Sequence, residues 1–305
     1  MSGIAATDAA RQVEPHLSVV MPTFNNEAVL RLALEGWRRF GGDEIEIIVV
    51  EDGCGDGTAA FLEREAASAW GRAHLRWMHE DDAHELRCTN RGLAAGRGAL
   101  LAAWQDDMFL RAPWLVPELL ATFRTYPDLG MVSLGRGLDC VPCDDPIERW
   151  EDLTDWRRLQ STIGHGPANW LRLQEVDAVI RPWVVRRTCL DRVGLLDEAF
   201  RPTEWDEADL AFRIRRAGWR VATYGYERLG AYFHRGSTTI GTPSRAYLDR
   251  VLANGRLFHD RWDDEIARTH ARPRRTWRRQ ATPAGWAATM VQSVRAGARR
   301  ALGAA

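Results

Sequence analysis

The sequence predicts an α/β fold: a mixed, mostly parallel sheet flanked by helices, with a C-terminal helical extension. Two observations lead to this prediction. Short apolar runs rich in β-branched residues alternate with stretches of helical periodicity over the first 60 residues. Polar and acidic residues follow directly after several of these runs. Strands joined by helices are typically parallel, and such sheets bind ligands beyond the carboxyl ends of their strands.

The first four elements are expected in the order strand, helix, strand, helix. Residues 17–21 (LSVVM) form an apolar run that Pro22 ends. Asn25 or Asn26 can cap a helix that continues to about residue 40, where Gly41 stops it. Residues 45–50 (IEIIVV) are the second strand, and the loop EDGCGDGT leads to a helix from about Thr58. This order favours a parallel α/β sheet.

The later elements follow from the same patterns. Strands are expected at residues 131–134, 176–185 and 219–224. Helices are expected at residues 113–125, 187–193, 209–217 and 244–262. Residues 137–175 are loop-rich and contain several tryptophans, which indicates an insertion over one face.

Composition limits the class of protein. The 305 residues are 45% hydrophobic and 27% charged, as is typical of globular proteins. No run of about 18 apolar residues is present, so we expect no transmembrane helix. Residues 1–15 lack the features of a secretory signal and are expected to be a disordered lead-in. The five scattered cysteines favour reduced thiols and hence a cytoplasmic protein.

The basic residues are unusual in type and in distribution. All 41 are arginine, and the absence of lysine excludes a phosphate-binding P-loop, a Schiff base and a pyridoxal enzyme. After Glu265 the chain has nine arginines and no acid, so the preceding part carries a net charge of about −10. The basic tail predicts peripheral contact with the inner face of the cell membrane. The alternative is a basic helix that docks on the acidic body. Nucleic acid is not expected, because only the basic tail would favour it and the tail lacks a series of aromatic stacking platforms between its arginines.

Two acidic clusters are candidates for function. Asp106 and Asp107 end an apolar run, where a hard cation such as Mg²⁺ or Mn²⁺ together with a phosphate would compensate them. The alternative is that they, like Asp52, are loop acids that cap helices. The stretch TEWDEADLAF places four acids at one helix entrance, more than the helix dipole requires. One of these acids is a candidate general base.

Two further features bear on the list of candidates. His234, at an expected strand end before Arg235, is either a metal or diphosphate ligand or a structural histidine. The glycines at positions 53, 55 and 57 do not complete a dinucleotide fingerprint, since Thr58 stands where glycine or alanine is needed.

In this order the motifs resemble those of family 2 nucleotide-sugar glycosyltransferases. The matching stretches are LSVVMPTFNN, EIIVVEDGCGDGT, NRGLAAGRGALLAAWQDD, VGLLDEAF, EWDEADLAFRIRRAGWRV and FHRGS. The resemblance covers about residues 16–238. It implies a GT-A-like, Rossmann-like catalytic domain with a nucleotide-binding half (about 16–110) and an acceptor half (about 111–238). Residues 239–305 would form the helical extension with its basic tail.

The resemblance also implies roles for individual residues. The loop bordering the nucleotide contains Pro22, Thr23, Asn25 and Glu27, and Asp52 binds the edge of the base. Asn90 and Gly92 match the N-x-G stretch of the family, and Arg87 or Arg97 meets the phosphates. Asp106 lies at the ribose and the metal, Asp107 ligates the metal, and His234 contacts the metal or the diphosphate. Glu207 takes the position of the base, with Asp206 close behind.

The sequence departs from the family at three places. Glu51-Asp52 replaces an Asp-Asp pair, and Gln105-Asp106-Asp107 lacks the first acid of the Asp-x-Asp motif. The usual Glu-Asp pair is reversed to Asp206-Glu207, which leaves the identity of the base open.

A single base without an evident nucleophile favours direct displacement with inversion at the sugar. The expected donor is a UDP-, GDP- or dTDP-sugar. The expected acceptor is a hydroxyl of a glycan or lipid-linked molecule, in polysaccharide or glycoconjugate synthesis. Two alternatives stay open: a degenerate homologue that binds without transfer, and a nucleotidyltransferase, although PTFNNEAV lacks the basic glycine-rich loop usual in that class.

Overall fold

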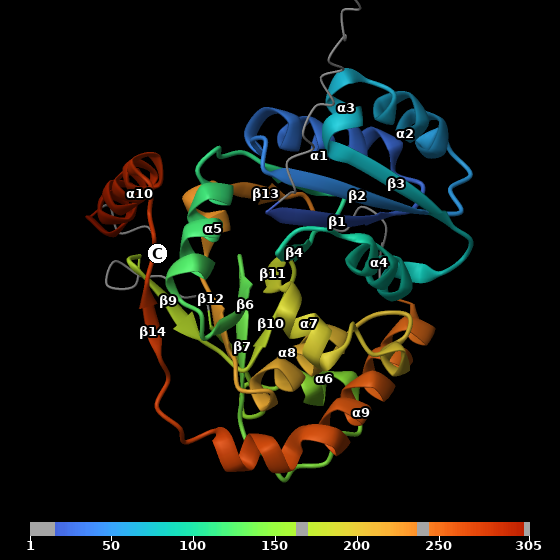
Figure 1. Cartoon of the computed structure of the whole chain (residues 1–305). Coiled ribbons are helices and arrows are strands. Elements are labelled where there is room, and N and C mark those ends of the chain that lie inside the picture. Colours follow the sequence, from blue (N-terminus) through green and yellow to red (C-terminus); the bar gives the residue numbers. More distant parts are fainter. Residues whose placement is uncertain (1–15, 163–169, 237–243, 302–305) are drawn as a thin grey trace, which may run out of the picture.

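The computed structural model describes residues 16–162, 170–236 and 244–301, so the predicted lead-in at residues 1–15 lies outside the described residues. A nine-stranded sheet crosses the molecule and carries helices on both faces (Figure 1). In spatial order its strands are β14 (Thr276–Arg278), β9 (Arg172–Glu175), β12 (Arg220–Thr223), β6 (Leu129–Ser133), β11 (Trp183–Arg186), β4 (Leu100–Ala103), β1 (Leu17–Thr23), β2 (Ile45–Asp52) and β3 (Leu75–Glu80). The α/β fold class predicted from the sequence is confirmed.

Two small sheets lie beside the main one. The first contains β10 (Ala178–Val179), β7 (Gly137–Cys140) and β8 (Leu159–Thr162), and the second pairs β13 (Tyr232–His234) with β5 (Met108–Leu110). The helices are α1 (Glu27–Phe40), α2 (Thr58–Ala66), α3 (Ala69–His74), α4 (His84–Ala95), α5 (Leu115–Thr125), α6 (Trp150–Leu153), α7 (Arg187–Val193), α8 (Asp206–Arg216), α9 (Arg245–Thr269) and α10 (Pro283–Ala301). Two 3₁₀ turns are η1 (Glu198–Phe200) and η2 (Tyr226–Leu229).

The core has two parts, one on each face of the sheet. Helices α1, α2 and α5 cover one face, and α4, α7, α8 and α9 cover the other. Successive side chains of β1 point to opposite faces of the sheet, so that Val19 and Met21 belong to the first part of the core and Val20 belongs to the second. Every residue of β2 is buried, as expected for a central parallel strand covered on both faces.

The directions of the strands determine at which edge of the sheet their following loops meet. β1, β2 and β4 run parallel, as do β6 and β12, whereas β11 runs antiparallel between β4 and β6. β3 runs parallel to β2 as well. The carboxyl ends of β1, β2, β3, β4, β6 and β12 and the beginning of β11 therefore lie at one edge of the sheet. The loops after those ends and the loop before β11 can bring their side chains together there.

Two parts of the chain differ from the expectation. The single strand predicted at residues 176–185 is two strands, β10 and β11, because Arg181 and Pro182 interrupt the run and turn the chain from one sheet to another. The loop-rich stretch 137–175 contains β7, α6, β8 and β9 in its described part.

The C-terminal extension is joined to the body by β14, which pairs with β9 in the main sheet. Arg274 pairs with Asp177 at 2.6 Å, and Arg275 with Asp128 at 3.1 Å. Arg279 donates to both oxygens of Glu118, at 2.8 and 3.1 Å, and both side chains are almost fully buried. This part of the basic tail therefore docks on the acidic body. No helix in the described ranges has the length and apolar character needed to cross a bilayer.

The buried pair gives a stability prediction. Arg279→Met leaves the Glu118 carboxylate buried without its cation, and we expect a loss of about 3–5 kcal/mol in the free energy of unfolding. Arg278→Met is the matched control, because Arg278 is the exposed neighbouring arginine at the end of β14, and its replacement should cost no more than about 0.5 kcal/mol. Urea denaturation measures both. Equal midpoints for the two variants would contradict the account.

Candidate active site

The loops after β1 and β2 are tied together at the edge of the sheet. The Gly55 N–H donates to the Asn25 side chain at 2.7 Å, and the Glu27 N–H donates to Asp56 at 3.2 Å. Asn25 adopts a left-handed conformation with φ of 48°, which asparagine tolerates better than most residues. The two loops thus form one wall, built on the ends of neighbouring parallel strands.

Asp106 and Asp107 follow β4 at the same edge. The Thr23 hydroxyl donates to Asp106 Oδ2 at 2.6 Å. Burial raises the pKa of Asp106 to about 6, more than the Thr23 and Asn26 hydrogen bonds lower it, and the charge of Asp107 adds to the rise. An aspartate held in this way gains from a nearby cation, because the cation offsets the cost of burying its charge.

Asp107 has a partner on the adjacent small sheet. Pairing of β13 with β5 places His234 opposite Met108, and His234 Nε2 lies 3.4 Å from Asp107 Oδ1. The hydrogen bond to Asp107 raises the pKa of His234. Asp107 and His234, brought together from positions far apart in the chain, converge on one point.

The donor set fits a divalent cation that is only partly held by protein. The described residues contain no cluster of three or more potential ligands. Magnesium sites commonly use one or two carboxylates and complete their coordination with substrate phosphates and water. The combination of carboxylate and imidazole also suits Mn²⁺. Asp107 and His234, with Asp106 beside them, would hold such an ion.

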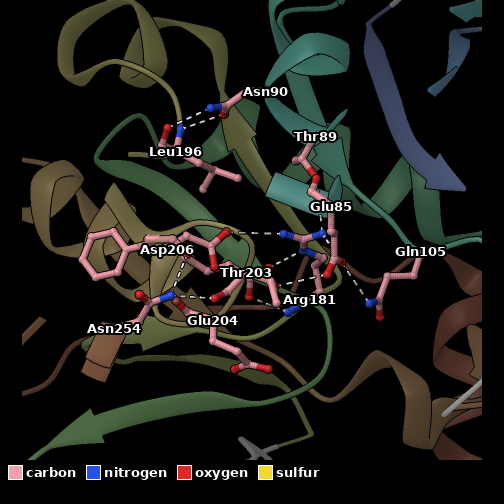
Figure 2. Close-up of polar contacts among 12 residues, drawn as sticks. Glu85, Thr89, Asn90, Gln105, Arg181, Leu196, Thr203, Glu204, Asp206 and Asn254 are labelled. Atoms are coloured by element: carbon pink, nitrogen blue, oxygen red, sulfur yellow. Dashed lines mark hydrogen bonds and ion pairs between the residues drawn. The ribbon is translucent and has the colours of Figure 1, made fainter. Parts of the chain in front are cut away.

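A buried arginine lies at the centre of the edge. Figure 2 shows Arg181 between Glu85 and Asp206. Its guanidinium lies 2.6 Å from Glu85 Oε1 and 3.5 Å from Asp206 Oδ2. It also pairs with Glu207 Oε1 through Nε, and the Arg181 N–H donates to Glu207 Oε2 at 3.1 Å. One cation therefore compensates three carboxylates, which come from α4 and from the entrance of α8.

The two acids at the entrance of α8 differ in environment. Asp206 is almost fully buried, and its Oδ2 accepts no hydrogen bond from the described residues. Burial raises its pKa, and the charge of Glu207 raises it further. The Glu207 side chain keeps 15% of its surface exposed. Glu207 is the more accessible of the two, and Asp206 the more strongly desolvated.

The backbone before α8 is strained. Glu204 and Trp205 have φ of 76° and 68°, in the left-handed region that non-glycine residues rarely occupy. The Asn254 side chain, on α9, donates to the carbonyls of Phe200 and Thr203 and so holds this turn in place. Asp209, in contrast, pairs with Arg213 and Arg261 away from the edge and is structural.

Arg181, its three carboxylate partners and His234 line a cavity of about 860 Å³, large enough for a small ligand. Its walls come from the loops after β6 and β12, from the loop before β11 and from the entrance of α8. Among the polar lining residues are Glu85, Gln105, Arg136, Arg181, Thr203, Glu204, Asp206, Glu207, Glu227, Arg228 and His234. A second hollow of about 620 Å³ adjoins it at Thr203, Glu204 and Val251.

Three residues implied by the family motifs are not brought to this edge. The Asn90 side chain bonds both the carbonyl and the N–H of Leu196 and clamps that loop. Gly92 allows α4 to approach β1, because an added Cβ would lie 2.2 Å from Val20 Cγ1. Arg97 binds Glu46 at the amino ends of the strands, on the far side of the sheet.

The remaining candidates border the edge. Asp52, at the end of β2, accepts hydrogen bonds from the Ala83 and His84 N–H groups at 2.6 and 2.8 Å and thereby caps α4. Pro22 lies one residue before the end of β1. Arg87 lines the second hollow and pairs with Glu198 at 2.9 Å, with both side chains about half exposed.

Sequence reasoning missed Arg181 and Glu85. The available signal for Arg181 was a charged residue inside an otherwise apolar stretch, VDAVIRPWVV, where an isolated charge needs a buried partner. Glu85, in the first turn of α4, gave no comparable signal.

Comparison with known proteins shows which proteins this chain resembles. Residues 18–128 match the family described as "Glycosyl transferase family 2". The chain is 30% identical over 134 residues to "Putative glycosyltransferase EpsH" of Bacillus subtilis (strain 168), covering 44% of this chain and 35% of that protein. It is 26% identical over 236 residues to "Validoxylamine A glucosyltransferase" of Streptomyces hygroscopicus subsp. limoneus, covering 70% and 51%. The chain thus spans about half or less of the length of these relatives.

A solved structure gives the fold. "GalNAc-T7 with UDP, GalNAc and Mn2+" superimposes with a TM-score of 0.59 at 11% sequence identity, covering 82% of this chain and 49% of that one. The fold is the GT-A fold, as the resemblance implied.

The cluster around Arg181 gives a prediction with a pH signature. Arg181→Met leaves Glu85, Asp206 and Glu207 without their shared cation, and we expect a loss of about 3–5 kcal/mol of stability near pH 8. The loss should shrink towards pH 5, because protonation then neutralises acids that nothing balances. Arg136→Met, at the same cavity but without an ion pair to any residue that the structure describes, should change little at either pH. Chemical denaturation at both pH values measures this, and a loss independent of pH would count against the assignment.

Proposed function

We propose that the protein transfers a sugar from a nucleoside diphosphate to a hydroxyl acceptor, because residues 18–128 match glycosyl transferase family 2 and the fold is the GT-A fold. The observation that carries this proposal is the meeting, at one sheet edge, of a candidate cation site with a cavity that holds candidate bases. Residues 16–110 would bind the donor, and residues 111–238 would supply most of the acceptor side.

The donor is proposed to lie across the ends of β1, β2 and β4. Pro22, Thr23, Asn25 and Glu27 border the nucleotide, and each Asp52 oxygen keeps a lone pair for an N–H of the base. Asp106 faces the ribose. Asp107 and His234 would hold Mg²⁺ or Mn²⁺, which as a Lewis acid supplies charge stabilisation for a leaving diphosphate.

The acceptor hydroxyl is proposed to lose its proton to Glu207. Of the two acids at the entrance of α8, Glu207 is the more accessible from the cavity. Arg181 fixes the orientation of Glu207 through the N–H and the guanidinium, and Asp206 shares that cation. With one base on the wall and no side chain assigned as a nucleophile, direct displacement with inversion is the proposed course. The acceptor is proposed to be a glycan or a lipid-linked molecule.

Donor binding is the first test. We expect one of UDP, GDP and dTDP to bind in the presence of Mn²⁺ and to lose at least tenfold in affinity without it, or in Asp107→Asn, by isothermal titration calorimetry. Asp249→Asn removes an exposed carboxylate on α9 and serves as the control that keeps wild-type affinity. Binding that is indifferent to Mn²⁺ and to Asp107 would remove the cation site from the proposal.

Release of nucleoside diphosphate from the matching sugar nucleotide tests catalysis. We expect Glu207→Gln to lower the rate at least 100-fold while donor affinity stays within a few-fold, since general base catalysis contributes about 10²–10⁴. Asp206→Asn should lower the rate less. The reverse order would assign the base to Asp206. A wild-type protein that binds a donor and never releases diphosphate with any acceptor supplied would instead fit the degenerate, non-catalytic alternative.

A further inference from the structure

Helix α10 presents an unpartnered apolar face to solvent. Met290, Val291 and Val294 are 60%, 50% and 70% exposed. Their spacing of one and four positions places them within one sector of the helix. Large exposed apolar side chains gathered on one helix are unusual on a globular surface and commonly mark an interaction site.

The opposite face of α10 is anchored in the body. Gly285 and Thr289 are buried, and the Thr289 hydroxyl accepts a hydrogen bond from Arg279 at 2.6 Å. The Thr282 N–H, just before the helix, donates to Glu118 at 2.9 Å. The buried ion pair of Glu118 and Arg279 therefore fixes which face of α10 points outwards.

Charge distinguishes this surface from the rest of the molecule. No acid follows Glu265 in the sequence, whereas Arg278 and Arg295 are exposed beside and on α10. The sequence adds Arg299 and Arg300 at the end of the helix. An apolar strip on a segment whose charged residues are all arginines matches an anionic lipid surface, where arginines meet headgroups and apolar side chains enter the acyl boundary.

The position of α10 connects this surface to the cavity. α10 packs against η2, and η2 supplies Glu227 and Arg228 to the cavity wall. Arg228 is exposed and makes no side-chain ion pair with any described residue. A lipid surface that contacts α10 would thus lie next to the wall of the cavity that η2 forms.

We propose that α10 docks on an anionic membrane surface through Met290, Val291 and Val294, with Arg295 at the headgroups, and presents the cavity to acceptors held in that membrane. The docking is inferred from the surface of α10 alone. The presentation of acceptors rests on the proposed function.

Vesicle sedimentation with the full chain tests the docking. We expect binding to vesicles of phosphatidylcholine with 30% phosphatidylglycerol, and at least tenfold weaker binding to phosphatidylcholine alone. The triple change Met290→Ser, Val291→Ser and Val294→Ser should lower the partition coefficient at least tenfold. Arg295→Gln should lower it about fivefold at low salt and less at 0.5 M salt. No binding by the wild-type protein to anionic vesicles would overturn the proposal.

Two controls separate the proposal from its rivals. Leu32→Ser removes an apolar side chain that is 56% exposed on α1, far along the chain from α10, and should leave vesicle binding unchanged. Light scattering of the wild-type and triple variants shows whether α10 instead joins two copies, because a dimer that dissociates in the variant would overturn membrane docking. Donor binding and diphosphate release in solution should be unchanged in the triple variant, so a failure of docking and a failure of the proposed transfer are measured separately.

Discussion

The arrangement at the carboxyl edge of the sheet depends on one electrostatic constraint, the sharing of Arg181 among three carboxylates. Glu85 comes from α4, and Asp206 and Glu207 come from the entrance of α8. Like charges this close together in a largely buried place would repel one another without the guanidinium. The same cation therefore joins the loop before β11 to α4 and α8, which cover the same face of the sheet. It compensates the acids that line the cavity.

The antiparallel direction of β11 makes this possible. In an all-parallel sheet the beginning of a strand lies far from the carboxyl ends of its neighbours. Because β11 runs between β4 and β6 in the opposite direction, its first residues lie beside the last residues of both. The antiparallel pairing of β13 with β5 likewise brings His234 to this edge, next to Asp107, although the two residues are more than a hundred positions apart in the sequence. The site is thus a product of strand direction as much as of residue type.

The sequence was sufficient to predict the first strands and helices and the positions of the acidic loops, because apolar periodicity and turn residues are local signals. It could not show where individual motif residues point. Asn90, Gly92 and Arg97 match a family motif, yet they clamp a loop, admit a close helix and bind Glu46. Arg181 and Pro182 mark locally where residues 176–185 divide, but which sheet each of the two strands joins is a tertiary property that no local pattern contains. The three acids that Arg181 pairs with come from distant parts of the chain, so its partners could not be predicted either.

β14 has a consequence for how this chain can be shortened. It covers the outer side of β9, which otherwise would be the edge of the main sheet. A protein cut before residue 270 would expose the unpaired N–H and C=O groups of β9, a ready template for pairing with another chain. The C-terminal segment therefore protects the molecule from self-association, a task separate from any partner that it binds.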